Sequence, residues 1–372
     1  MNITRAVITA ASPRQRSLPL QTLIDRDGCQ KPVLRILIEE VVAAGIERIC
    51  VVVYPGDEST YASVAGDHAG RLRFVQQREP RGYADAVSCA AEFAGDAPFV
   101  HLIGDHLYVS QTGVSCARQL IQTALSWDSA VSSVQSTHEG QLAYFGAIGG
   151  FRLEEHDRLY RIERVVEKPT PTQAEQELMI PGLRAGHYLC LFGMHVLTPT
   201  IFEILAQQQR DPVSCGSTEA TFGTVADNIG ADGGTDAGAA GAFSRALTQL
   251  AAQEQFLALE MQGWRYDLGA KYGLLTAQLA LGLSGQEREE VMARLLELLA
   301  LRQLAAPPVS DDLAADTAAA AHRGAPAGNK PGVAGVGDGG SRDATADQPD
   351  GSTGGASGMS RNGVDRRGME AS

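Results

Sequence analysis

An apolar run in LIGDHLY, residues 102–108, places Asp105 directly after a predicted strand. A carboxylate at the end of a strand can hold a magnesium ion, which prefers one or two carboxylates together with phosphate oxygens. The alternative is a structural aspartate that caps a turn. His101 and His106 suggest a zinc site, but no third ligand is spaced for zinc in the sequence, so we expect packed or solvated histidines instead.

A second polar pair ends the run VVEKPTP, residues 165–171, where Glu167 and Lys168 stand side by side before Pro169. Successive side chains of a strand point to opposite faces unless the strand twists or ends between them. One of the two could then accept hydrogen bonds from sugar hydroxyls while the other meets a phosphate. The alternative is an exposed, charged strand end.

A third candidate is Asp267 in WRYDLGAKYGLLTAQ, residues 264–278, which ends another strand, and Lys271 opens the helix that follows. A second carboxylate is what a metal ion shared with a bound nucleotide needs. The alternative for Asp267 is a helix N-cap.

The N-terminal segment RAVITAASPRQRSLPLQ, residues 5–21, is a short strand followed by a basic loop. A strand that leads into a basic loop often meets phosphate, but phosphate loops are usually built on glycine, and this one has none. Two hypotheses remain open. The loop either binds phosphate through Arg14 and Arg16, or it is the remnant of a phosphate loop.

The elements that must position these residues alternate between apolar strands and helices from Arg5 to Asp105, which predicts a doubly wound α/β start. Strands are expected over 6–10, 49–54, 72–76 and 99–103, and helices over 32–44, 59–65 and 82–93. In such sheets ligands lie beyond the carboxyl ends of the strands. The loops at 11–19, 77–82 and 104–108 should therefore face one crevice.

The second half of the chain predicts a mixed α+β arrangement. Strands are expected over 130–135, 145–150, 160–166, 187–194 and 256–261, and helices over 243–252, 271–282 and 287–304. Residues 229–242 predict a flexible loop within a domain that spans 1–305. Residues 306–372 contain no aromatic residue and have the composition of a disordered, low-complexity tail.

Charge and composition exclude several classes of partner. The formal net charge of −13 argues against a general nucleic-acid or anionic membrane surface. No apolar run approaches the roughly 20 residues that a membrane-spanning helix needs. Six scattered cysteines contain no CxxC pair, so buried free thiols and a cytoplasmic location are expected.

Taken in order, these motifs resemble the bacterial UTP-glucose-1-phosphate uridylyltransferases within the sugar nucleotidyltransferases. The resemblance spans about residues 4–283 and rests on RAVITAA, R16-x-L-P19, K31-P32, AAGIERICVVV, QREPRGYADAV, GDHLY, FGAIGG, VVEKPTP, AGHYLCLFGMHVLTP and YDLGAKYG. It implies a Rossmann-like nucleotidyltransferase fold with a mixed, mostly parallel sheet and a C-terminal helical segment. The last helix is a candidate for contact between copies of the chain.

The resemblance also implies site roles and a reaction. UTP and glucose 1-phosphate would be the substrates, and the sugar phosphate would displace pyrophosphate in line. Arg16 and Lys168 take the catalytic charge-stabilising roles. The implied magnesium ligands are Asp105 and Asp267, and the implied substrate-binding residues are Gln77, Gly82, Gly146, Glu167, Gly186 and Lys271.

Two stretches depart from the family pattern. The family's loop usually reads G-x-G-T-R, whereas Ser12, Pro13 and Arg14 stand here, and Ala84 and Asp85 replace its usual G-H pair. Side chains and the missing N–H of proline narrow a loop that must wrap a triphosphate. The alternative function is therefore a catalytically silent relative that binds a nucleotide or sugar nucleotide as a regulatory or interaction subunit.

Overall fold

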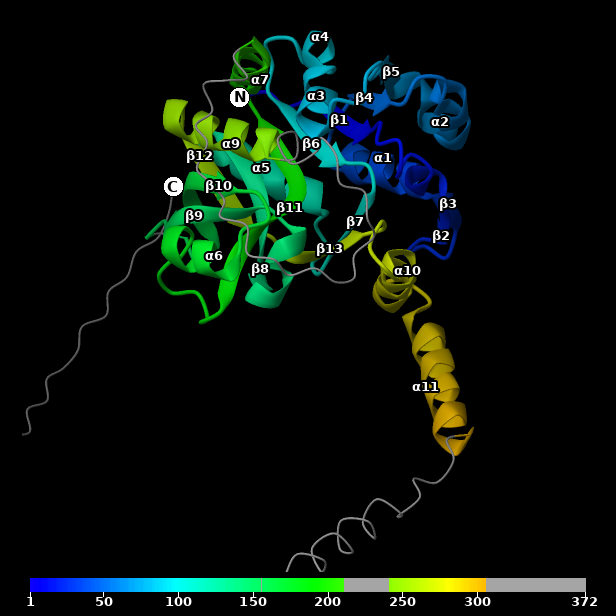
Figure 1. Ribbon diagram of the computed structural model, residues 1–372. Helices are drawn as coiled ribbons and strands as arrows, with labels where there is room; N and C mark the ends of the chain where they lie inside the picture. Colours follow the sequence, from blue (N-terminus) through cyan, green and yellow to red (C-terminus); the bar gives the residue numbers. More distant parts are fainter. Residues whose placement is uncertain (155, 211–240, 306–372) are drawn as a thin grey trace, which may run out of the picture. The chain divides into compact units, whose positions relative to one another are not determined.

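The computed structural model describes residues 1–154, 156–210 and 241–305. Their backbone is organised around a nine-stranded sheet in the order β5-β4-β1-β6-β11-β8-β12-β10-β9 (Figure 1). The strands are β1 Arg5–Ala10, β4 Arg48–Val53, β5 Leu72–Gln76, β6 Phe99–Ile103, β8 Ala130–His138, β9 Ala147–Arg152, β10 Leu159–Val166, β11 His187–Leu197 and β12 Phe256–Glu260.

The first half of the sheet is parallel, and its strands β1, β4 and β6 are buried on both faces. β1 lies between β4 and β6, so that Val7 faces Cys50 on one side and His101 on the other. Strands covered on both faces need continuous apolar runs such as RICVVV rather than alternating ones. The predicted doubly wound start is confirmed, and β5 and β6 have the predicted bounds.

The second half makes the sheet mixed, as expected. β11 pairs antiparallel with both β6 and β8, β12 pairs parallel with β8, and β10 pairs antiparallel with β12 and β9. Among the described strands of this sheet, β11 and β10 run against the common direction. The sheet is therefore mostly parallel in strand direction, although antiparallel contacts dominate its second half.

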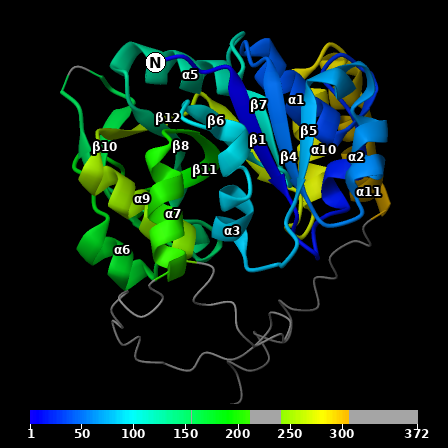
Figure 2. The same cartoon turned by 90° about the horizontal axis from the view of Figure 1, so that it is seen from above.

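Helices cover both faces of the sheet. Buried side chains of α1 and α5 join one apolar cluster, and those of α3, α7 and α9 join the other. Figure 2 shows these two sets on opposite sides of the strands. The helices are α1 Val33–Ala43, α2 Glu58–Val64, α3 Tyr83–Ser88, α4 Ala91–Ala94, α5 Cys116–Trp127, α6 Pro171–Glu177, α7 Thr200–Arg210, α9 Ala242–Gln253, α10 Gly273–Ser284 and α11 Arg288–Ala305.

One predicted helix is wrong in its extent. The expected helix over 82–93 is divided into α3 and α4, because the chain tightens where the Ala90 N–H bonds to the Val87 carbonyl, three residues back. Gly82, at φ 101°, precedes α3 in a conformation that favours glycine. The predicted loop at 229–242 falls almost entirely outside the described residues, as does the predicted tail at 306–372.

Two small ribbons complete the described fold. β2 Thr22–Ile24 pairs with β3 Gln30–Pro32, and β7 His106–Ser110 pairs with β13 Gly263–Asp267. The second ribbon sets Asp267 directly opposite His106. It therefore joins the loop after β6 to a segment that lies far along the chain.

The C-terminal helix α11 follows α10 and contacts it through Val291, which faces Gly282. Much of its apolar surface is uncovered, since Leu296, Leu298, Leu299 and Leu301 are all more than half exposed. Among the described helices, none combines the length and the apolar character needed to cross a bilayer.

Candidate functional site

A cleft of about 650 Å³ lies at the carboxyl ends of β1, β5 and β6. From the first half of the chain its lining takes Thr9–Gln15, Pro19, Gln77, Pro80, Gly82, Tyr83, Ala86, Ile103, Asp105 and His106. From the second half it takes Tyr144, Phe145, Gly146, Glu167, Lys168, Leu191, Gly193, His195, Phe243, Ser244 and Asp267. All three predicted loops contribute, so the expected crevice is confirmed.

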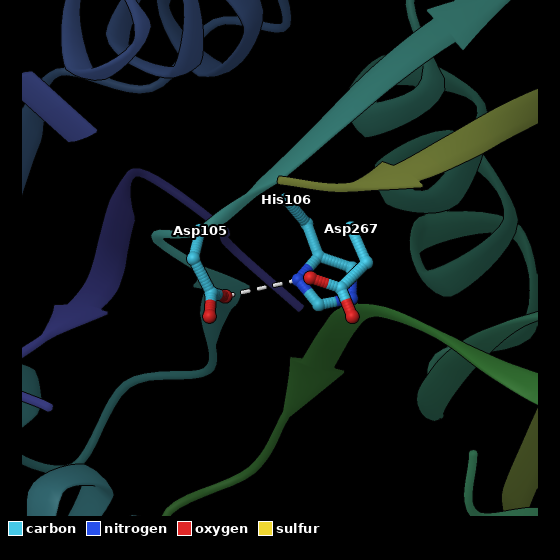
Figure 3. Close-up of side chains that lie close together, drawn as sticks. All are labelled: Asp105, His106 and Asp267. Carbon is cyan, nitrogen blue, oxygen red and sulfur yellow. Dashed lines mark hydrogen bonds and ion pairs between the residues drawn. The ribbon is translucent and has the colours of Figure 1, made fainter. Parts of the chain in front are cut away.

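Asp105, His106 and Asp267 meet in this cleft and form the acidic cluster (Figure 3). One potential ligand atom from each residue lies within 4.8 Å of the others. Asp105 follows β6 directly, and the pairing of β7 with β13 brings Asp267 beside His106. The predicted convergence of the two aspartates is confirmed.

Local hydrogen bonds orient the acidic cluster. Asp105 Oδ1 lies 3.0 Å from His106 Nδ1, and Asp267 Oδ1 accepts a hydrogen bond of 2.8 Å from the Gly269 N–H. The Leu268 N–H donates to the Asp105 carbonyl at 2.9 Å, which links the two aspartate segments. Carboxylate oxygens and an imidazole nitrogen are donors that suit a divalent cation.

His106 has a neighbour from a distant part of the chain. No third ligand is spaced near it along the chain, yet the fold supplies Asp267 from a distant segment. The expectation of a packed or solvated His106 stays a prediction, since the contact of His106 with Asp105 does not by itself make it a metal ligand. His101 is fully buried and packed, as expected.

Glu167 and Lys168 both line the cleft. β10 ends at Val166, and Lys168 has a φ of 45°, so strand alternation no longer governs their directions. Ser244 Oγ donates to Glu167 Oε2 at 2.8 Å. A Cβ atom at Gly146 would lie only 3.0 Å from the same oxygen, so glycine leaves room there.

Gln77 and Gly82 contact each other in the lining of the cleft. Gln77 is only 4% exposed, and its Nε2 donates to the Gly82 carbonyl at 3.0 Å and to Asp85 Oδ2 at 2.8 Å. Asp85, one of the departures from the family pattern, is thus bound to Gln77. It is not among the residues that line the cleft.

Two neutral, buried histidines lie at the cleft, one of which, His195, belongs to its lining, and sequence reasoning gave neither a role. His101 on β6 and His195 on β11 are paired neighbours whose rings stack with centroids 5.8 Å apart. Burial lowers the pKa of His195 to about 3 and the pKa of His101 well below its usual value. His195 Nδ1 lies 2.7 Å from Ser132 Oγ. The signal that sequence reasoning could have used is a polar residue inside each of two apolar strands.

The two loop arginines have different positions. Arg14 lines the cleft, whereas Arg16 does not. Arg16 Nη1 lies 3.4 Å from Asp57 Oδ1, and its Cζ lies 4.6 Å from the centroid of the Tyr54 ring. To reach a ligand in the cleft, Arg16 must leave both partners.

Two further predicted residues also lie outside the lining. Gly186 precedes β11 and faces the Glu139 side chain, and the Lys271 ammonium lies 5.3 Å from the centroid of the Tyr272 ring. Gly193, seven residues after Gly186, does line the cleft, with a φ of 87° in the middle of β11. Tyr108 Oη donates to the Gly193 carbonyl at 2.7 Å.

Comparisons with known proteins find similar sequences over most of the chain. A family model described as nucleotidyl transferase matches residues 22–280. The chain is similar to UTP–glucose-1-phosphate uridylyltransferases from Bacillus subtilis strain 168, at 26% identity over 79% of this chain and 96% of the relative, and from Streptococcus pneumoniae serotype 4, at 27% identity over 80% and 96%.

Solved structures support the same fold. A UTP-bound UGPase from Acinetobacter baumannii superposes with a TM-score of 0.57 at 21% identity, over 80% of this chain and 100% of that one. A UDP-glucose pyrophosphorylase in complex with UDP-glucose gives the same TM-score at 20% identity, over 75% and 98%.

Proposed function

The chain belongs to the nucleotidyl transferase family, and on that premise we propose that it transfers a uridylyl group from UTP to glucose 1-phosphate, giving UDP-glucose and pyrophosphate. The B. subtilis and S. pneumoniae relatives are named for this activity. The observation that carries the proposal is that Lys168 and the acidic cluster line one cleft. Fixed charges around a transferring phosphoryl group are the main catalytic requirement of such a reaction.

The acidic cluster fits a divalent cation. Asp105 and Asp267 each offer a carboxylate, and His106 holds one oxygen of Asp105 by a hydrogen bond. We assign the two aspartates to magnesium, which commonly binds through one or two carboxylates and substrate phosphates. When bound, such an ion neutralises charge on phosphate oxygens and orients them.

The remaining lining residues are assigned by their chemistry. Glu167 accepts hydrogen bonds and lines the cleft beside Gly146, and we assign these two residues to the hydroxyl-rich sugar ring. Lys168, next along the chain, carries the charge for the sugar phosphate. Gln77 and Gly82 contact the base, while Arg14 and Arg16 belong to the loop nearest the triphosphate.

The proposed reaction requires no protein nucleophile. An oxygen of the sugar phosphate attacks the α-phosphorus of UTP, and the bond from that phosphorus to the bridging oxygen breaks on the opposite side. The electron pair of that bond leaves with pyrophosphate. Lys168 holds the attacking phosphate in line and offsets its negative charge.

A second candidate function is supported by the loop after β1. Residues 11–16 contain no glycine, and Arg16 is engaged by Asp57. Both features suit a protein that binds a nucleotide or sugar nucleotide without turnover and acts as a regulatory or interaction subunit.

Pyrophosphate release distinguishes the two candidates. Purified protein with magnesium should release pyrophosphate from UTP only when glucose 1-phosphate is added, and other nucleoside triphosphates and sugar 1-phosphates give the substrate range. Lys168→Met should abolish most of this release, and Asp96→Asn, a change at an exposed position outside the cleft, should not. Calorimetric binding of UTP or UDP-glucose without any pyrophosphate release would favour the silent subunit. Absence of both would contradict both functions.

A further inference from the structure

The side-chain amide of Gln77 is held in one orientation. Its Nε2 is directed at two oxygens, the Gly82 carbonyl at 3.0 Å and Asp85 Oδ2 at 2.8 Å. A backbone carbonyl and an ionised carboxylate only accept hydrogen bonds. The NH₂ group must therefore face these two oxygens, and the oxygen Oε1 must face away from them.

Because Gln77 is buried, reversing its side-chain amide would carry a cost in free energy. Gln77 is 4% exposed and lines the cleft, and no residue within the described ranges donates to its Oε1. A reversed amide would set a buried oxygen against two other acceptors, which is costly. The cleft thus presents a fixed hydrogen-bond acceptor at this position.

Asp85 makes the stronger of the two contacts that fix Gln77, because hydrogen bonds to ionised groups are stronger than neutral ones. It lies in the first turn of α3 and outside the cleft lining, so it acts on a ligand only through Gln77. This position also explains how a carboxylate is tolerated near a triphosphate site. It is turned toward an amide NH₂ group rather than toward phosphate.

We propose that Asp85 is a positioning residue that, by fixing Gln77 Oε1 as an acceptor, selects a pyrimidine base that carries a hydrogen on N3, such as uracil, over cytosine. Uracil offers an N3–H donor between two carbonyl oxygens, whereas N3 of cytosine is itself an acceptor. The inference rests on the proposed function, in which Gln77 contacts the base. Thymine shares this edge of uracil, so Asp85 does not discriminate between those two bases.

Calorimetry with UTP and CTP tests the proposal in the full chain with magnesium present. The unmodified protein should bind UTP at least tenfold more tightly than CTP. Asp85→Asn offers either an oxygen or an NH₂ group to Gln77, so it should lower the UTP to CTP affinity ratio at least fivefold, or about 1 kcal/mol. Asp85→Glu keeps the carboxylate and should keep the ratio within about twofold, as should Asp96→Asn at an exposed site.

A second measurement uses only the unmodified protein, so its result does not depend on whether a variant folds. The triphosphate of 3-methyluridine lacks the N3–H and should bind the unmodified protein at least tenfold more weakly than UTP, whereas the 5-methyl analogue should bind normally. Equal binding of UTP and its 3-methyl analogue would overturn the inference. An unchanged UTP to CTP ratio in a folded Asp85→Asn protein would also overturn it while leaving the proposed function intact. A protein that binds no nucleotide would overturn both.

Discussion

Substitution of the two loop arginines, one at a time, tests which of them serves the triphosphate. Arg14 lines the cleft, whereas the Arg16 guanidinium contacts Asp57 and the Tyr54 ring. The sequence pattern assigns the phosphate role to Arg16. The structure makes that role conditional on a rearrangement, so Arg14→Ala and Arg16→Ala should differ in their effects on UTP binding.

The contacts that Arg16 must give up determine how much the effects of the two substitutions on UTP affinity should differ. Leaving Asp57 costs up to about 1 kcal/mol for a partly exposed ion pair. Leaving the Tyr54 ring costs about 0.5–1 kcal/mol. A charge-assisted bond to phosphate returns about 1.5–3 kcal/mol, so the net contribution of Arg16 is about 1 kcal/mol, or roughly fivefold in affinity. Arg14 already lines the cleft, so a charge-assisted bond from it to phosphate contributes up to about 1.5–3 kcal/mol, or roughly 10- to 150-fold.

Isothermal titration of UTP with magnesium measures both variants, and thermal melts verify that each is folded. We expect Arg14→Ala to weaken UTP binding more than Arg16→Ala does, and Arg16→Ala to weaken it no more than about fivefold. Asp57→Asn removes the competing carboxylate and serves as a third test. If Arg16 reaches the ligand, Asp57→Asn should strengthen UTP binding. The same substitution should have no such effect in a protein that also carries Arg16→Ala.

A larger loss of affinity in Arg16→Ala than in Arg14→Ala would refute this reasoning. It would mean that Arg16 leaves Asp57 and Tyr54 at little cost and is the main phosphate contact. No UTP binding by the unmodified protein would refute the assignment of either arginine to phosphate.

Four further predictions concern the metal, pH, assembly and the tail. Asp105→Asn keeps an oxygen that can pair with His106 but loses the negative charge of the carboxylate. The affinity for Mn²⁺, measured by electron paramagnetic resonance, should therefore fall at least tenfold with little change in melting temperature. An unchanged Mn²⁺ affinity would contradict the metal assignment. The pKa of His195 is about 3 in the folded chain and about 6.5 in the unfolded chain, so the unfolded chain binds the extra proton and the free energy of unfolding should fall from pH 7 to pH 5, with about 2 kcal/mol of that fall due to His195. A folded His195→Gln variant, which keeps the similar contribution of the buried His101, should therefore show a fall that is smaller by about 2 kcal/mol. We propose that the exposed leucines of α11 join copies of the chain. The double substitution Leu296→Glu with Leu299→Glu should then convert an oligomer into a monomer, as measured by light scattering. An unmodified protein that is already monomeric would contradict the proposal. Removal of residues 306–372, which lack aromatic side chains, should leave the melting temperature and pyrophosphate release unchanged.

The strands that position the site could be predicted because their signal is local. The runs that form β5 and β6 are bounded by turn residues, and Asp105 follows from the end of β6. Asp105 lies in the cleft because ligand sites form beyond the carboxyl ends of parallel strands. Asp267 lies beside it for a different reason, which is the antiparallel pairing of β13 with β7 outside the nine-stranded sheet.

The missed features depend on tertiary contacts that no local pattern encodes. His106 joins the acidic cluster only because β7 pairs with β13. Gly186 and Gly193 stand in the same family-like segment, and their different positions relative to the cleft depend on the conformation of β11, where Gly193 has a φ of 87°. The engagement of Arg16 by Asp57 depends on how the loop after β1 folds back toward the segment after β4.

The ribbon of β7 and β13 has a consequence for the order in which the chain acquires function during synthesis. The strands β1, β4, β5 and β6 are adjacent in the sheet and come from the first third of the chain, so they can pair early. Asp267 reaches its partners only after most of the domain has been translated, and contacts between such distant segments form slowly. A nascent or prematurely terminated chain that ends before β13 would lack one carboxylate of the acidic cluster, so incomplete products would be unable to hold the ion as the finished protein does.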